Sequence, residues 1–61
     1  MSAAYDKQIE RLRKLEKRYS SLMKQSYQAA INNREYSQEL RQIAKEIKIE
    51  IDTLKEQLLT H

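Results

Sequence analysis

The sequence predicts an all-α protein, folded as a two-helix antiparallel hairpin that pairs with a second hairpin into a four-helix bundle. Three observations lead to this prediction. Glycine and proline are both absent, which removes the commonest turn residues and the two strong helix breakers. Charged residues make up 34% of the chain, a content typical of long helices and coiled coils. Apolar residues also recur in steps of three and four, the pattern of an amphipathic helix.

The size of the chain predicts a partner. Sixty-one residues form at most one domain, and we take residues 1–61 as a single helical domain. A chain this short buries little apolar surface and usually needs a covalent staple, a metal or a partner to be stable. It has no cysteine, so a disulfide is excluded. We therefore expect self-association, as a homodimer, or binding to another protein.

The first helix is predicted over about residues 3–31. In a heptad frame with Ile9 at position a, the apolar residues fall at a and d, and also at g. An a/d/g face is wider than the seam of a two-stranded coiled coil and suits a bundle of three or more helices. The apolar stripe of this helix consists of Tyr5, Ile9, Leu12, Leu15, Tyr19, Leu22, Met23 and Ala30.

The second helix is predicted over about residues 34–59, and the same heptad frame continues through it without a break. Position g is apolar here at Tyr36 and Ile43, so this helix also has a wide apolar face. Its stripe consists of Tyr36, Leu40, Ile43, Ala44, Ile47, Ile51, Leu54 and Leu58.

A turn at residues 32–33 is predicted because the seam loses its large side chains there. Asparagine tolerates the left-handed conformation that ends helices. Asn32 and Glu35 are also spaced as in a capping box, which predicts Asn32 as the N-cap of the second helix. The consecutive d and a positions of this central segment hold only small or polar residues, namely Ser26, Ala30, Asn33 and Ser37.

The alternative fold is one continuous helix in an oligomeric coiled coil. A hairpin does not require its two helices to share a heptad phase, and an accidental match of phase has a chance of roughly one in seven. The unbroken phase therefore favours the rod. The wide apolar face and the weak central seam favour the hairpin, which we adopt.

Charge is distributed unequally along the chain. The first helix contains seven basic and three acidic residues, and the part from Arg34 onward contains five basic and six acidic ones. We expect the basic first helix to face an acidic flank of the second. Four of the bases recur at helical spacing as a basic strip: Lys7, Arg11, Lys14 and Arg18.

No catalytic, cofactor-binding or metal-ligating constellation is present in the sequence. The only histidine is the last residue, His61, and the carboxylates alternate with basic residues along the chain. We therefore expect no enzyme activity, cofactor, metal or small-molecule substrate. Because there is no long apolar run or secretory signal, we also expect no transmembrane segment and a cytoplasmic location.

The function predicted from these features is a non-enzymatic protein–protein interaction, as a small adaptor, assembly factor, chaperone-like or regulatory binding partner. A second contact is predicted at Ile49, Tyr27 and Ile31, which lie off the main stripe. The alternative is a small basic nucleic-acid-binding bundle that holds phosphates with the basic strip. The predicted partner interface consists of Ile9, Leu12, Leu15, Tyr19, Leu22, Met23, Leu40, Ile43, Ile47, Ile51, Leu54 and Leu58.

Two short segments resemble a known family. Residues 37–40, Ser-Gln-Glu-Leu, and residues 9–13, Ile-Glu-Arg-Leu-Arg, are similar to segments of small helical-hairpin phosphatases that act on sporulation response regulators. Residue 41 is arginine, where that family has the acidic residue on which its activity depends. The resemblance therefore implies a helical hairpin and does not imply phosphatase activity.

Overall fold

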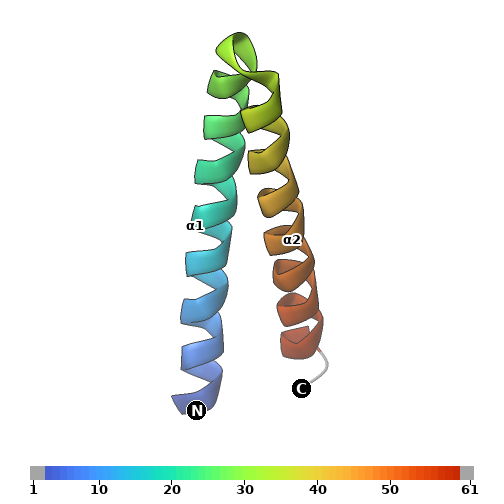
Figure 1. Ribbon diagram of the computed structural model, residues 1–61. Coiled ribbons are helices and arrows are strands. Elements are labelled where there is room, and N and C mark those ends of the chain that lie inside the picture. Colours follow the sequence, from blue (N-terminus) through green and yellow to red (C-terminus); the bar gives the residue numbers. More distant parts are fainter. Residues whose placement is uncertain (1–2, 60–61) are drawn as a thin grey trace.

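The protein is a two-helix antiparallel hairpin, as the sequence predicts. The computed structural model describes residues 3–59 and contains helix α1, Ala3–Asn32, and helix α2, Arg34–Leu59 (Figure 1). The two helices lie side by side in a slender molecule of 48 × 15 × 11 Å. The alternative of a continuous rod is wrong, since one helix of this length would extend for roughly 85 Å.

A single residue, Asn33, connects the two helices. Its backbone N–H donates to the carbonyl of Ala29 at 2.6 Å, which closes α1, and its own carbonyl accepts from the N–H of Ser37 at 3.0 Å, which opens α2. Its side-chain Oδ1 accepts a third hydrogen bond, from the N–H of Tyr36 at 3.1 Å. Asn33 is thus the N-cap of α2, because its side chain satisfies an N–H that has no partner within the helix.

The structure corrects two details of the predicted turn. The N-cap is Asn33 and not Asn32, which is the last residue of α1. The turn also needs no left-handed residue, because no residue in the described range 3–59 has a positive φ. The chain therefore reverses its direction at Asn33 with a negative φ.

Replacement of Asn33 by alanine is expected to lower the free energy of unfolding by about 1 kcal/mol, because the cap to the Tyr36 N–H is lost. Thermal denaturation followed by circular dichroism measures this change. Asn32→Ala is the matched control, since Asn32 is exposed and alanine favours the helix. If Asn32→Ala destabilises more than Asn33→Ala, the cap assignment is wrong.

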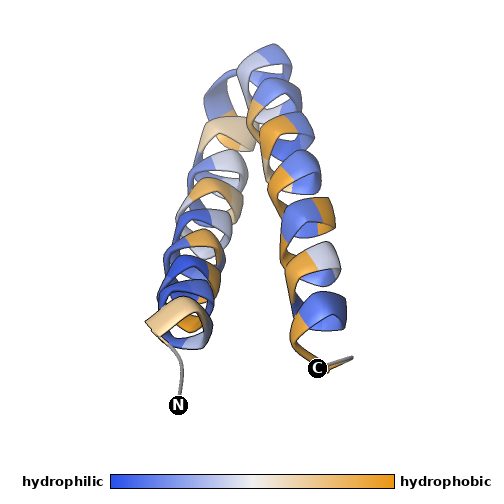
Figure 2. Ribbon diagram, turned by 90° about the horizontal axis from the view of Figure 1, so that it is seen from below, coloured by the Kyte–Doolittle hydropathy of each residue, from blue (hydrophilic) through white to orange (hydrophobic). Residues whose placement is uncertain are grey.

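The core is contributed mainly by α2. The buried apolar residues of α2 are separated by steps of four, three, four and three. They therefore occupy alternating d and a positions on the face toward α1. Hydrophobic residues recur along both helices in Figure 2. The buried apolar residues are Leu40, Ala44, Ile47, Ile51 and Leu54.

The apolar stripe of α1 is only half-buried, and the one fully buried residue of this helix is Ser26. A single neighbouring helix covers the a and d positions but cannot enclose a face that extends to g. Position a is also interrupted by Glu16, whose carboxylate Oε2 lies 3.4 Å from the Lys55 Nζ of α2. The hairpin therefore leaves apolar surface of α1 open to solvent.

Two buried serines join the helices beside the turn. Ser37 Oγ donates to the carbonyl of Ser26 at 2.7 Å, and Ser26 Oγ donates to the carbonyl of Met23 at 2.8 Å. Both residues are buried, with exposed fractions of 3% for Ser37 and 0% for Ser26. Their small side chains allow the two helices to approach closely enough for a one-residue connection.

Candidate protein-interaction surface

The hairpin has two chemically different sides. In an antiparallel pair the g positions of both helices flank one side of the seam and the e positions flank the other. On the g side, Arg11 Nη2 of α1 lies 3.9 Å from Glu50 Oε2 of α2. On the e side, the guanidinium of Arg41 lies 5.8 Å from the centre of the Tyr27 ring. We call these two surfaces the g side and the e side.

The g side carries an apolar patch formed by both helices. Leu15, Leu22 and Ala29 of α1 are half-buried, because α2 covers only part of each side chain. Tyr36 and Ile43 of α2 remain 49% and 40% exposed. These five residues, which we call the g-side patch, lie at successive g positions and form a stripe that no other element of the described chain covers.

The predicted partner interface divides into two groups. Four of its residues form the core of the hairpin and are buried against α1: Leu40, Ile47, Ile51 and Leu54. The other eight keep part of their surface accessible, with Ile43 the most exposed of those on α2: Ile9, Leu12, Leu15, Tyr19, Leu22, Met23, Ile43 and Leu58. A partner can therefore contact the second group without opening the hairpin.

The three residues predicted as a second contact do not form one surface. Tyr27 and Ile31 lie on α1 near the turn, with exposed fractions of 60% and 84%, and the Tyr27 ring packs under Arg41. Ile49 is 59% exposed and lies on α2, in the half of that helix distant from the turn. It lines an open depression together with Arg11 and Gln57. Ile49 is thus an isolated exposed residue.

The basic strip lies along the outer surface of α1, and all four of its residues are exposed. Two of them are already paired with carboxylates of the same chain. Arg11 faces Glu50, and Lys14 Nζ lies 3.7 Å from Glu10 Oε1. Exposed ion pairs of this kind are each worth under about 1 kcal/mol. The strip is therefore partly neutralised by its neighbours.

The charges of α2 are sorted between the two sides. Every basic residue of this helix is at e or b, and every acidic residue except Asp52 is at c, f or g. The basic first helix therefore meets an acidic flank of the second on the g side, as the Arg11–Glu50 pair illustrates. On the e side, the basic residues of α2 include Lys55, which pairs with Glu16 at an a position of α1.

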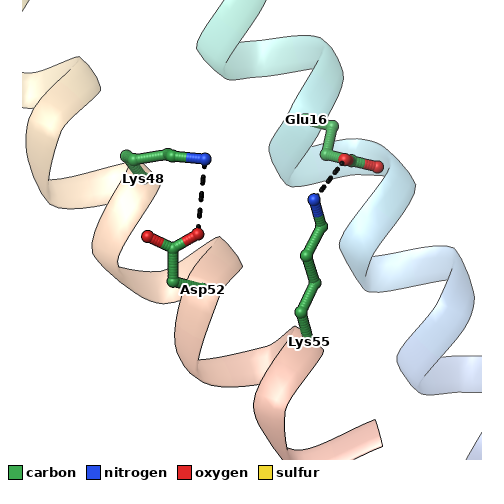
Figure 3. A network of polar contacts seen from close by, with 4 residues as sticks. All are labelled: Glu16, Lys48, Asp52 and Lys55. Carbon is green, nitrogen blue, oxygen red and sulfur yellow. Dashed lines mark ion pairs between the residues drawn. The ribbon is translucent and has the colours of Figure 1, made fainter. Parts of the chain in front are cut away.

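Figure 3 shows the ion pairs of the e side, with Lys55 reaching across the seam to Glu16. Lys48 Nζ instead lies 3.3 Å from Asp52 Oδ1, one turn further along the same helix (Figure 3). The side chains of both pairs are about half exposed, so water screens them. Of these two pairs, only Lys55–Glu16 joins one helix to the other, and both contribute little to stability.

Sequence reasoning did not identify the g side as a single surface. The signal was available, because the e-position bases and the c-position acids of α2 stand at fixed seven-residue spacing. The antiparallel direction of the helices was also predicted, but not which flanks of the two helices lie on the same side of the seam. Only an antiparallel hairpin brings the g positions of both helices onto the same side of the seam.

Neither a metal cluster nor a membrane-spanning helix is found among residues 3–59. No three histidine, cysteine, aspartate or glutamate side chains of this range lie together as metal ligands would. Within the same range, neither helix has a stretch apolar enough to cross a membrane. His61, which the sequence excluded as a site residue, lies outside the described residues.

Residues 37–40, which resemble the phosphatase signature, lie near the start of α2. Ser37, the first of these residues, is buried and donates its hydroxyl to the Ser26 carbonyl, and Leu40 belongs to the core. These two side chains hold the hairpin together. The chain matches no protein-family model, no curated protein and no solved structure.

Proposed function

We propose that this protein is a non-enzymatic protein–protein interaction module that binds its partner through the g-side patch. The observation that supports this proposal is the exposure of Tyr36 and Ile43 beside the half-buried leucines of α1, on one side of a hairpin too thin to cover them. An apolar stripe with charged borders is the surface by which helices bind other helices.

The g-side patch supports this function better than the basic strip supports nucleic-acid binding. Tight binding of a phosphate backbone depends on several free cations that release counterions together. Two of the four strip residues, Arg11 and Lys14, have intramolecular carboxylate partners. An adaptor or assembly factor, by contrast, needs only an accessible apolar face on a stable scaffold, which the buried stripe of α2 supplies.

Replacement of Ile43 by aspartate is expected to weaken partner binding at least tenfold, because it places a charge in the centre of the g-side patch. The apolar contact of Ile43 with the partner is lost, and the aspartate carboxylate must be desolvated when the partner binds. Binding is measured in two ways: self-association by analytical ultracentrifugation, and capture of partner proteins from the native cell with the wild-type chain as bait.

Ile49→Asp is the matched control for Ile43→Asp. It makes the same chemical change on the same helix, at a residue that is also exposed but stands at f, on the border of the g side and outside the five residues of the patch. Circular dichroism establishes that both variants stay folded. If Ile49→Asp abolishes binding and Ile43→Asp does not, the interaction surface has been assigned to the wrong residues. A wild-type chain with neither a self-complex nor a specific partner overturns the proposed function itself.

A further inference from the structure

We propose that the g-side patch binds a second copy of this chain, with α1 of each copy lying over α2 of the other and both turns at the same end of the resulting four-helix bundle. This inference rests on the proposed function and names its partner. It is drawn from the signs of the charges that border the patch and from the register of the two helices.

The two borders of the g side carry opposite charges. On α1, the c, f and g positions contain four basic residues and no acidic one: Lys7, Arg11, Lys14 and Arg18. On α2, the same positions contain five acidic residues and no basic one: Glu35, Glu39, Glu46, Glu50 and Glu56. The g side is therefore an apolar stripe between a basic border and an acidic border, a pattern that a second copy can complement.

Two-fold symmetry allows two ways to stack such faces. If the axis runs parallel to the helices, α1 lies over the partner's α2, neighbouring helices are antiparallel and the turns are at the same end. If the axis crosses the helices, α1 lies over the partner's α1 and the turns are at opposite ends. Only the first arrangement places the basic border against the acidic one, whereas the second opposes like charges.

The register of the hairpin aligns specific residues across this interface. Ser26 lies opposite Ser37, as their hydrogen bond shows. Arg18 precedes Ser26 by eight residues, so it lies at the height of the residue that follows Ser37 by eight, which is residue 45. Glu46 is one residue further along α2, a displacement of about 1.5 Å. An axis parallel to the helices keeps every residue at its own height. Arg18 of each copy therefore faces Glu46 of the other.

The apolar residues align by the same rule. Leu22 lies within two residues of the level of Ile43, and Ala29 within two residues of the level of Tyr36, each a displacement of about 3 Å. In the paired arrangement Leu22 packs on the exposed Ile43, and the small side chain of Ala29 leaves room for the ring of Tyr36. Apolar side chains and charges thus favour the same arrangement.

The charges that would form the central pair are free in the single chain. Among residues 3–59, no ion pair involves Arg18, Glu39 or Glu46, and all three are exposed. Reversing the charge of Arg18 or Glu46 therefore leaves the ion pairs of the hairpin intact and acts on the contact between copies.

A charge exchange tests the contact. Arg18→Glu and Glu46→Arg are each expected to raise the dissociation constant of the self-complex about tenfold, because each replaces two symmetric attractions by two repulsions. A mixture of the two variants is expected to form a heterodimer of near wild-type affinity, since acid and base face each other again at both contacts. Sedimentation velocity measures all three.

Lys17→Glu is the matched control for the charge exchange. It makes the same change of net charge one residue away, at a b position on the e side that has no ion pair in the described chain. It is expected to leave the dissociation constant unchanged. Equal loss with Lys17→Glu, or a mixture of the Arg18 and Glu46 variants that fails to associate, overturns the proposed contact.

The position of the turns is measured independently with a spin label. The chain has no cysteine, so Ile31→Cys, at a site 84% exposed beside the turn, carries a single label per copy. Turns at the same end are expected to give an inter-label distance of about 30 Å, set by two helix layers and the two label arms on their outer faces. Turns at opposite ends give a distance close to the 48 Å length of the hairpin.

The outcomes separate this inference from the proposed function. A self-complex with the long distance overturns the arrangement. A wild-type chain that stays monomeric at 100 µM, and that captures a different protein lost with Ile43→Asp, overturns the second copy as partner while the interaction function stands. The short distance together with heterodimer rescue is the expected result.

Discussion

Replacement of Ile51 by alanine is expected to lower the free energy of unfolding by about 3 kcal/mol. The Ile51 side chain is 2% exposed, in the middle of the buried stripe of α2, so its truncation removes apolar burial and leaves a cavity. A chain of 61 residues has a total stability of roughly 3–9 kcal/mol. This one substitution therefore removes a large share of the stability, as urea denaturation followed by circular dichroism measures.

Ile49→Ala is the control that separates the effect of burial from the effect of replacing an isoleucine by alanine on this helix. The two isoleucines stand two residues apart on the same helix, but Ile49 is 59% exposed. Its truncation is expected to change the free energy of unfolding by less than about 0.5 kcal/mol. Both variants are compared at one protein concentration, since self-association adds to apparent stability. Equal destabilisation by the two substitutions would mean that the Ile51 face is not the core.

Three leucines in the centre of the seam are expected to convert the hairpin into a rod. In the triple variant Ser26→Leu, Asn33→Leu and Ser37→Leu, two large side chains replace the serines whose small size lets the helices meet beside the turn, and the N-cap of α2 is removed. The same leucines fill the d and a positions that the continuous heptad frame lacks.

The triple variant is therefore expected to form an oligomeric coiled coil of roughly 85 Å, against the 48 Å of the hairpin. Small-angle X-ray scattering measures the difference in maximum dimension. A second triple variant, Ser21→Leu, Gln28→Leu and Asn32→Leu, adds equal apolar content at three exposed positions off the seam and is expected to remain a hairpin. A compact particle with the first variant would show that the central residues do not determine the fold.

The helices and the turn were predictable because their signals are local. The spacing of apolar residues determines which face of each helix is buried, and the residues at the core of α2 are those of the predicted stripe. The loss of large side chains between Ser26 and Ser37 also marked the turn correctly, because these serines form the tight layer where the helices cross closest to the connection.

The continuous heptad phase gave the misleading signal. It favoured a rod because a loop of arbitrary length would leave the heptad phase of the second helix unrelated to that of the first. The connection is one residue, however, and the N–H and carbonyl of Asn33 bond as they would in an unbroken helix. A connection of this kind keeps the same heptad register in both helices although the chain reverses its direction. The choice of Asn32 as the cap was wrong, because its spacing to Glu35 favoured it although the neighbouring Asn33 offers the same chemistry.

The candidate surface could be predicted only in part. Its residues belong to the wide apolar face recognised in the sequence, but the sequence did not separate those that hold the hairpin from those left accessible. That separation depends on which side each helix presents to the other, as the contrast between buried Leu40 and exposed Ile43 shows. It is a property of packing between segments distant in the chain.

The one-residue connection at Asn33 also governs how the chain reaches this structure. Contacts beside the turn, such as that between Ser26 and Ser37, close loops of about ten residues, which form within 10–100 ns. Each later contact, out to the pair of Arg11 and Glu50, closes a longer loop only after the shorter ones have formed, so the entropy lost at each step is small. We therefore expect the hairpin to form from the turn outward, and its free ends to open first in the native state.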